Sequence, residues 1–163
     1  MGTANSRATR AGRSSAAQPQ GCTNLKLRQL GRMVGRHYEA YVAPSGLKGT
    51  QYSLLSHVVK LGPLRAGDLA AAMQLDASTL TRNLQPLLRD GLLVLQPDPD
   101  DARSRFVVAT PAGHELRAKA QRAWKQAQLA LNAKLGVERV AALHVLLDEC
   151  RALLDEDPTT PED

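Results

Sequence analysis

One short segment of the sequence carries side chains that could hydrogen-bond to the base edges of duplex DNA. Leucines recur there at helical spacing, and polar residues fill the positions between them: Ser78, Thr79, Thr81, Arg82, Asn83 and Gln85. Such side chains supply the donors and acceptors that distinguish base pairs in the major groove. A merely solvated helix surface would have the same composition. The segment therefore indicates a DNA-reading helix only if a second feature places it beside DNA.

A hairpin with basic residues follows this segment and supplies that second feature. Arg103 and Arg105 lie at the end of a loop rich in proline and aspartate, residues 97–103. The runs 92–95 and 105–108 on either side are β-prone, which predicts a hairpin. Guanidinium groups on a hairpin could enter a minor groove or contact phosphates. Ordinary surface charge is the alternative, because three acids lie close by: Asp98, Asp100 and Asp101.

The helices that must position these two features can be predicted in order. Asp76 is a good N-cap for the polar helix, because its carboxylate can accept from amides of the first turn, and Gly91 is a good terminator. Apolar spacing of three and four predicts earlier helices at about 27–41, 50–61 and 66–73. Two helices, a polar helix and a hairpin form the order of a winged helix-turn-helix. The predicted fold is thus mainly helical with a small β-hairpin wing.

Further apolar patterns predict which faces are buried and where the chain continues. The first helix would bury the face made by Leu27, Leu30, Val34, Tyr38 and Tyr41, and the second would bury Leu54, Leu55, Val58 and Leu61. Thr110-Pro111 predicts the start of a long helix that ends near Leu135. Beyond Gly136, a last helix carries an apolar seam, whose terminal position favours a contact between subunits: Val140, Leu143, Leu147, Cys150 and Leu154.

The sequence resembles the MarR family of bacterial transcription regulators over about residues 24–154. Short motifs in the family's order carry the resemblance: Leu69-Ala70, Asp76-x-Ser78-Thr79-Leu80-Thr81-Arg82, Leu87-Leu88-x-x-Gly91-Leu92, Asp98-Pro99-x-Asp101-x-Arg103-Ser104 and Thr110-Pro111-x-Gly113. The sequence departs from the family where Lys48 and Arg65 replace helix-capping Ser or Thr. It departs again at Ala102, a position that is often basic.

The resemblance implies a homodimer that binds a pseudo-palindromic operator in double-stranded DNA, in most members as a repressor. Residues 22–46 and 110–154 would form dimerisation helices, and residues 47–109 the winged DNA-binding region. The polar helix would enter the major groove, and Arg103 would form the wing tip, with Asp101 pairing with it and aiming it. A small-molecule effector, often an anionic aromatic, would bind between the two regions and release the DNA.

The location of that effector site is expected only from the family's pocket position. Five residues are candidates for its lining: Arg32, Arg36, His37, Tyr52 and His57. The alternative is that these side chains are packed or solvated. The four histidines lack the i, i+4 spacing of metal ligands on one helix, and no metal or cofactor is expected.

The two cysteines offer a different trigger, since some family members sense oxidants through cysteine. Cys22 precedes the first helix and Cys150 lies on the last. If these helices interlock in a dimer, the two thiols could approach one another and form a disulfide that shifts the DNA-binding regions. An oxidant-sensing repressor is therefore one alternative function. The other interpretation is a flexible-arm thiol and a buried apolar thiol.

Composition and charge set the outer limits of these hypotheses. The chain has 163 residues, of which 43% are hydrophobic and 23% charged, which suits one globular domain. Residues 22–154 hold 18 basic and 11 acidic side chains, and a basic body favours a polyanionic partner. Residues 1–21 are predicted to be a disordered basic arm, and residues 155–163 a disordered acidic tail.

Several function classes are excluded by what the sequence lacks. It shows no secretory signal and no apolar run that could span a membrane, so we expect a cytoplasmic protein without a membrane partner. It shows no glycine-rich phosphate loop, nucleophile elbow or paired metal ligands, so we do not expect an enzyme. A winged-helix module that binds proteins and not DNA is a second alternative, and it predicts no salt-dependent binding to duplex DNA.

Overall fold

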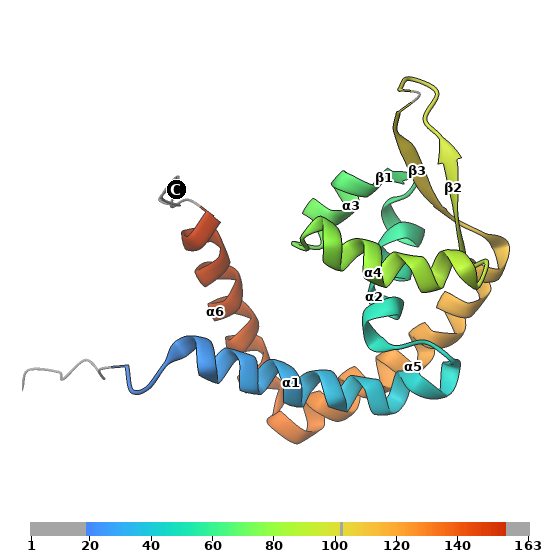
Figure 1. Ribbon diagram of the computed structural model, residues 1–163. Coiled ribbons are helices and arrows are strands. Elements are labelled where there is room, and N and C mark those ends of the chain that lie inside the picture. The colour runs from blue at the N-terminus through green and yellow to red at the C-terminus, as the bar shows by residue number, and fades with distance from the viewer. Residues whose placement is uncertain (1–18, 102, 156–163) are drawn as a thin grey trace, which may run out of the picture.

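The computed structural model describes residues 19–101 and 103–155 (Figure 1). Most of the predicted basic arm, the predicted acidic tail beyond Asp155, and Ala102 lie outside the described residues. The described helices are α1 (Thr23–Val42), the short 3-10 helix η1 (Ala43–Ser45), α2 (Gly49–Leu61), α3 (Ala66–Ala72), α4 (Ala77–Arg89), α5 (Pro111–Leu135) and α6 (Val137–Asp155). The described strands are β1 (Leu64–Arg65), β2 (Leu93–Pro97) and β3 (Arg105–Ala109).

The predicted wing is present and forms part of a three-stranded antiparallel sheet. β2 and β3 form the hairpin, in a register that pairs Leu93 with Ala109 and Pro97 with Arg105. β1 adds a third strand on the other edge of β3, with Arg65 opposite Phe106. A strand of two residues has too little sequence pattern to be predicted. Its pairing nevertheless ties the segment before α3 to the base of the wing.

The hydrophobic core lies where α2, α3, α4 and α5 meet this sheet. Its largest fully buried side chains are Leu54, Leu55, Leu69, Leu87, Leu93, Val42 and Val107. The prediction for α2 is confirmed at Leu54, Leu55 and Val58. It is wrong at Leu61, which is 54% exposed because it is the last residue of the helix and projects beyond the core.

Helix caps fix where α4, α5 and α2 begin. A carboxylate oxygen of Asp76 accepts from the Thr79 amide at 2.7 Å, and the Thr110 hydroxyl accepts from the Gly113 amide at 3.1 Å, so both predicted caps are confirmed. Lys48 provides no side-chain cap for α2. Glu39 of α1 supplies one instead, because its carboxylate accepts from the Gly49 amide at 2.6 Å. This cap couples α1 directly to α2.

α1 and the C-terminal part of α5 lie below the winged region (Figure 1). α1 and α5 lie side by side, and α6 turns away after Gly136 (Figure 1). Both predicted apolar faces are only partly buried within one chain: Tyr38 and Val140 are buried, whereas Leu27, Leu30, Tyr41, Leu147 and Leu154 are exposed. The prediction of a buried α1 face therefore holds at Tyr38 and in part at Val34, but not at Leu27 and Leu30, which line an open hollow between α1, α5 and α6.

Candidate nucleic-acid interface

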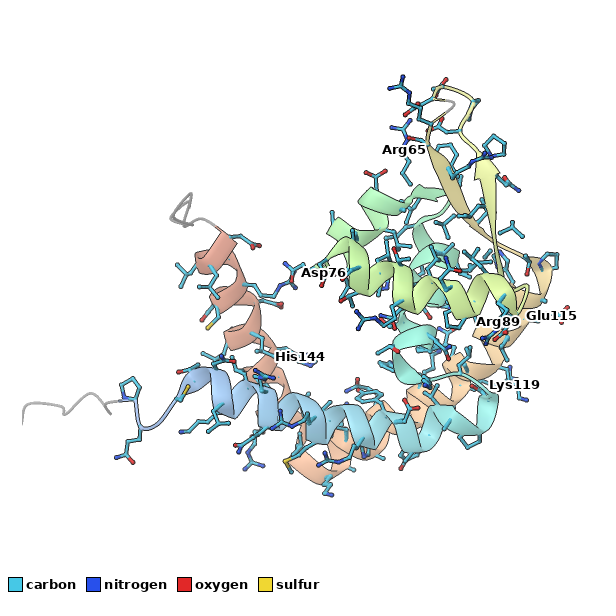
Figure 2. All side chains as sticks on the ribbon, viewed as in Figure 1. Arg65, Asp76, Arg89, Glu115, Lys119 and His144 are labelled. Carbon is cyan, nitrogen blue, oxygen red and sulfur yellow. The ribbon has the colours of Figure 1, made fainter. Side chains whose placement is uncertain are left out.

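α4 runs across the winged region below the wing (Figure 2), and its predicted DNA-reading face is largely exposed. Its apolar face is buried at Leu80, Leu84 and Leu87. The polar side chains divide into an exposed set, Ser78, Thr81, Arg82 and Gln85, and a half-buried pair, Thr79 and Asn83. The amphipathic pattern thus places all six on an accessible surface. Pro86 lies within α4 and does not end it.

The hydroxyl groups of this face are already engaged within α4. Ser78 and Thr79 donate to the Asp76 carboxylate at 2.6 and 2.8 Å, and Thr81 donates to the Ala77 carbonyl oxygen at 2.7 Å. Hydrogen bonds from Ser78 and Thr79 hold the pKa of Asp76 far below its ordinary value. A hydroxyl whose proton is so engaged offers a base only its lone pairs.

Donors for base edges on α4 must therefore come from other side chains. Among the described residues of α4, side-chain hydrogen bonds are donated by Ser78, Thr79, Thr81 and Arg89, and none is given for Arg82, Asn83 or Gln85. All three carry N–H groups that suit purine or pyrimidine edges. They are the strongest candidates for base contacts on this helix.

A groove of about 490 Å³ separates α4 from the wing. Thr81 and Gln85 of α4 line one side, and Arg103 and Arg105 of the wing line the other. Arg65, at the start of α3, completes a set of three guanidinium groups around this groove. The structure thus brings both predicted wing arginines together with part of the predicted helix face. The remaining candidates on α4 lie outside the groove lining.

Asp101 supports the wing loop differently from the prediction. Its carboxylate accepts from the backbone amide of Arg103 at 3.0 Å and from the hydroxyl of Ser104 at 2.7 Å. The hydrogen bond from Ser104 is the main reason that the pKa of Asp101 is lowered. Asp101 thus pairs with Arg103 through the backbone amide and not through the guanidinium, because the carboxylate is used to close the turn. The Arg103 side chain is left exposed.

Sequence reasoning missed the main ion pair of the wing. Asp98 is only 3% exposed, and its carboxylate lies 2.6 Å from Nη2 of Arg65. The hydrogen bond from Arg65 holds the pKa of Asp98 below its ordinary value. Asp98 is thus a buried partner of Arg65 and not a free surface charge. The available signal in the sequence was Arg65 itself, which stands where a helix-capping Ser or Thr is usual and therefore had another partner to find.

Comparison with known proteins identifies the family. A sequence model of the MarR family matches residues 45–104. Over 108 residues the chain is 30% identical to the multiple antibiotic resistance protein MarR of Salmonella typhimurium. The aligned segment covers 66% of this chain and 75% of that protein. The chain belongs to the MarR family. This membership identifies it as a transcriptional regulator and not an enzyme.

Solved structures of MarR-family regulators share the fold. The M. tuberculosis transcriptional regulator MosR, crystallised with DNA, is 32% identical with a TM-score of 0.65, and the match covers 80% of this chain and 99% of that one. A probable transcriptional regulator from Pseudomonas aeruginosa is 25% identical with a TM-score of 0.73, covering 78% and 96%. A MarR variant from E. coli complexed with operator DNA is 21% identical with a TM-score of 0.73, covering 78% and 91%, and supports the fold alone.

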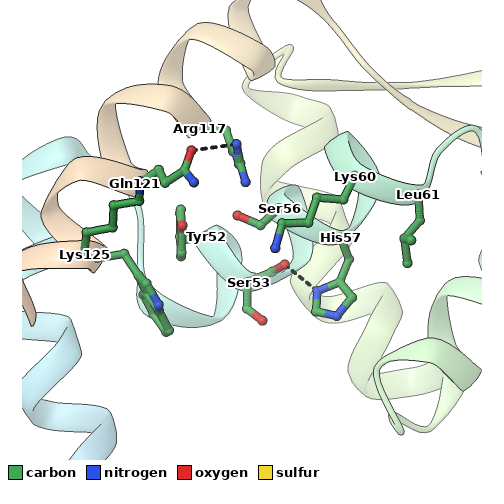
Figure 3. Close-up of a pocket in the computed structure, with 10 residues that line it drawn as sticks. Tyr52, Ser53, Ser56, His57, Lys60, Leu61, Arg117, Gln121 and Lys125 are labelled. Carbon is green, nitrogen blue, oxygen red and sulfur yellow. Dashed lines mark hydrogen bonds between the residues drawn. The ribbon is translucent and has the colours of Figure 1, made fainter. Parts of the chain in front are cut away.

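A cavity of about 430 Å³ lies between α2 and α5 of this MarR-family chain (Figure 3). Tyr52 and Trp124 give it aromatic surface, and its cationic groups come from three side chains: Lys60, Arg117 and Lys125. Oγ of Ser56 and Nε of Arg117 are buried without a hydrogen-bond partner in the described residues. Buried polar atoms usually have partners, so these two atoms favour a polar or anionic occupant.

The predicted effector residues divide between this cavity and other places. Tyr52 and His57 line it, whereas Arg32 and Arg36 are exposed on α1. Nε2 of His37 lies 2.8 Å from the Ala127 carbonyl oxygen, outside the cavity lining. Those three α1 residues are kept away because α1 packs beyond Trp124, whose ring is 4.1 Å from that of Tyr38 and 4.8 Å from that of Tyr52.

The cationic lining that the prediction missed follows a polar stripe on each of two helices. Ser53, Ser56, His57 and Lys60 recur at steps of three and four on α2. Arg117, Gln121, Trp124 and Lys125 do the same on α5. Such stripes were visible in the sequence, but only the packing of α2 against α5 shows that they face one another.

Further expectations for this MarR-family chain concern cysteine, metal and membrane. Cys22 and Cys150 are free and exposed, so the expectation of a buried thiol at position 150 is wrong for a single chain. The described residues hold no group of three His, Cys, Asp or Glu side chains placed to bind a metal ion. Of the described helices, none is long and apolar enough to cross a membrane.

Proposed function

We propose that the protein is a dimeric repressor that binds a pseudo-palindromic operator in double-stranded DNA. α4 would enter the major groove, and the wing would reach the adjacent minor groove. The observation that carries this proposal is the groove in which the α4 side chain Gln85 faces the wing cations Arg103 and Arg105. The complex of the 32% identical MosR with DNA supports it. Since DNA is the proposed partner, we place the protein in the cytoplasm.

Exposed apolar side chains on the two terminal helices support the homodimer. α1 presents Leu25, Leu27, Leu30 and Met33, and α6 presents Val145, Leu146, Leu153 and Leu154. Apolar surface of this extent on terminal helices is typical of a subunit interface. A second copy would cover these side chains. It would also place two α4 helices about one turn of DNA apart, as a palindromic operator requires.

The cavity between α2 and α5 supports release of DNA by an anionic aromatic effector. Its aromatic surface would contact the ring, and Lys60, Arg117 and Lys125 would attract the charge. The cavity lies between α2, in the winged region, and α5, one of the proposed dimerisation helices. An occupant that prefers one spacing of these helices would shift the protein toward the conformation with that spacing. If that conformation separates the α4 helices, the DNA is released.

The first test of the proposal is titration of the pure protein with the DNA upstream of its own gene. A scrambled fragment of equal length serves as the control, near physiological salt. Selective nanomolar binding with two subunits per site is expected. Equal, weak binding to both fragments would contradict this choice of operator. Absence of binding at every salt concentration would support the winged-helix protein-interaction module.

A cysteine-based oxidant response is a second candidate, favoured by the exposure of Cys22 and Cys150. Peroxide would then release the DNA without an effector. Replacing both cysteines by serine would abolish this response and leave DNA binding in the reduced state unchanged. If peroxide has no effect on the wild-type protein, this candidate is rejected.

A further inference from the structure

Arg65 and Asp98 connect the start of α3 to the wing through one ion pair. Nε and Nη2 of Arg65 each lie 2.6 Å from Oδ2 of Asp98. The Asp98 side chain is completely buried, whereas 45% of the Arg65 side chain is exposed. A buried carboxylate depends on its partner, since the charge has little access to water. The wing is therefore fixed at Asp98 and not only through its strand pairing.

Hydrogen bonds continue from this pair into the wing loop. The other carboxylate oxygen of Asp98 accepts from the Asp100 amide at 2.9 Å, and the Asp98 amide donates to the Ser104 carbonyl at 3.3 Å. Asp101 then holds the amide of Arg103. One connected set of contacts thus runs from Arg65 to the backbone of Arg103. Figure 2 shows Arg65 beside the wing, near its end.

The position of Arg65 in the fold gives this pair its role. Arg65 precedes α3, pairs with Phe106 of β3, and has its guanidinium carbon 5.8 Å from the centre of the Phe106 ring. It provides no side-chain cap for α3. Arg65 therefore does not cap α3, and its side chain instead forms an ion pair with Asp98 of the wing.

We propose that Arg65 is a positioning residue for DNA binding, which holds the wing through Asp98 and thereby places Arg103 against the DNA. The inference rests on the proposed DNA-binding function. It assigns Arg65 no base contact of its own. Without the ion pair, the end of the wing that carries Arg103 would be held less firmly. The Arg103 side chain would then contact the DNA in only a fraction of the complexes.

Asp98→Asn tests this inference by the sign of its effect. Loss of a negative charge near DNA raises affinity if only net charge matters. If the ion pair positions the wing, the same change lowers affinity about tenfold. The salt slope would fall by about one unit, because Arg103 loses a phosphate contact. Asp100→Asn is the matched control: it removes the same charge from an exposed neighbour, and affinity should stay equal or rise.

A double-mutant cycle separates positioning from direct contact. Arg65→Met and Arg103→Ala are made singly and together, and DNA affinity is measured for each. If Arg65 acts through Arg103, Arg65→Met has little further effect once Arg103 is gone. Additive losses would show an independent phosphate contact by Arg65 and would overturn the proposal.

Hydrogen exchange on the free full-length chain tests the same inference without DNA. Asp98→Asn is expected to speed exchange of amides in residues 98–105 while α2 and α5 keep their protection. If the wild-type protein binds no DNA, the proposed function fails, and exchange still decides whether the pair holds the wing. If the variant loses protection everywhere, Arg65→Lys replaces it, since it keeps the charge and loses the forked geometry. Unchanged exchange in the wing would overturn the inference.

Discussion

Gly113 of α5 lies directly against the main chain of Leu92 at the start of the wing. A Cβ atom added at Gly113 would overlap the carbonyl oxygen of Leu92. The same carbonyl accepts from the Thr110 amide at 3.1 Å, and the Thr110 hydroxyl donates to the Gly91 carbonyl at 2.7 Å. The first turn of α5 is therefore packed against the segment that joins α4 to β2, which connects α5 directly to the base of the wing.

Gly113→Ala is expected to lower the free energy of unfolding by about 1–3 kcal/mol, since the new methyl group forces backbone apart. Gly67→Ala is the control, because a Cβ there meets no atom within 4 Å. It should leave stability equal or slightly raised. Chemical denaturation of the two variants beside the wild type makes the comparison. Equal stability of all three proteins would contradict the close packing at Gly113.

Base contacts by α4 can be separated from its internal hydrogen bonds. Arg82→Ala or Asn83→Ala should each cost about 1–3 kcal/mol of binding free energy on the operator, if each makes a good base contact. Thr81→Ala should cost less, because the Thr81 hydroxyl already donates to Ala77. Titration of operator and scrambled DNA gives both values. An equal loss on both fragments would mean that Arg82 and Asn83 do not read bases.

The cationic cavity should bind a simple aromatic carboxylate. With benzoate as the probe, calorimetry is expected to detect binding to the wild type, and Arg117→Met should weaken it about tenfold or more by removing a charged hydrogen-bond donor. Lys134→Met, at the end of α5 and outside the cavity lining, serves as the matched control. If Arg117→Met binds benzoate like the control does, the cavity is not the effector site.

The exposed leucines of α6 should hold the dimer together. Leu146→Asp is expected to raise the dimer dissociation constant about 100-fold, because it places an unpaired charge in an apolar interface. DNA affinity should fall with it. Leu61→Asp changes an exposed leucine on α2, away from both apolar faces, and should remain dimeric. Sedimentation velocity at several concentrations distinguishes these outcomes. A dimeric Leu146→Asp protein would exclude this part of α6 from the interface.

Acid should weaken the fold through carboxylates whose pKa values are lowered in the folded state. The pKa of Asp76 is far below its ordinary value because Ser78 and Thr79 donate to it. The folded protein thus binds this proton less readily than the unfolded chain, so the stabilisation is fully present above about pH 4 and is lost as pH falls below it. Asp76→Asn should flatten the decline. Thermal unfolding between neutral and acid pH measures it, and identical profiles would contradict the role of this cap.

The sequence predicted those parts of the fold that depend on local signals. Asp76 and Thr110 are caps whose partners lie three residues away, and the α4 face follows from the spacing of its leucines. Contacts between distant residues had no such signal. The pairing of Arg65 with Asp98 joins residues 33 positions apart, and the cavity of α2 and α5 depends on how two helices pack.

Burial was predicted least well on the terminal helices α1 and α6, for which we propose an interface with a second copy. Leu27 and Leu154 have the spacing of buried residues but are exposed here. Apolar spacing indicates that a helix face is buried in the native protein. It does not indicate whether the element that packs on this face belongs to the same chain. Asp101 illustrates a second limit of sequence-based prediction. A carboxylate two residues before an arginine can accept from the backbone amide of the turn and not from the guanidinium, as Asp101 does.

Trp124 is the only tryptophan in the sequence, and its ring packs between Tyr38 of α1 and Tyr52 of α2. It also lines the cavity between α2 and α5. The protein therefore has a built-in optical reporter where α1, α2 and α5 meet. Indole emission responds to the polarity and the neighbours of the ring, so a shift of α1 against α2 or the filling of the cavity changes the fluorescence of one residue. The conformational state can be followed in solution without attaching a dye.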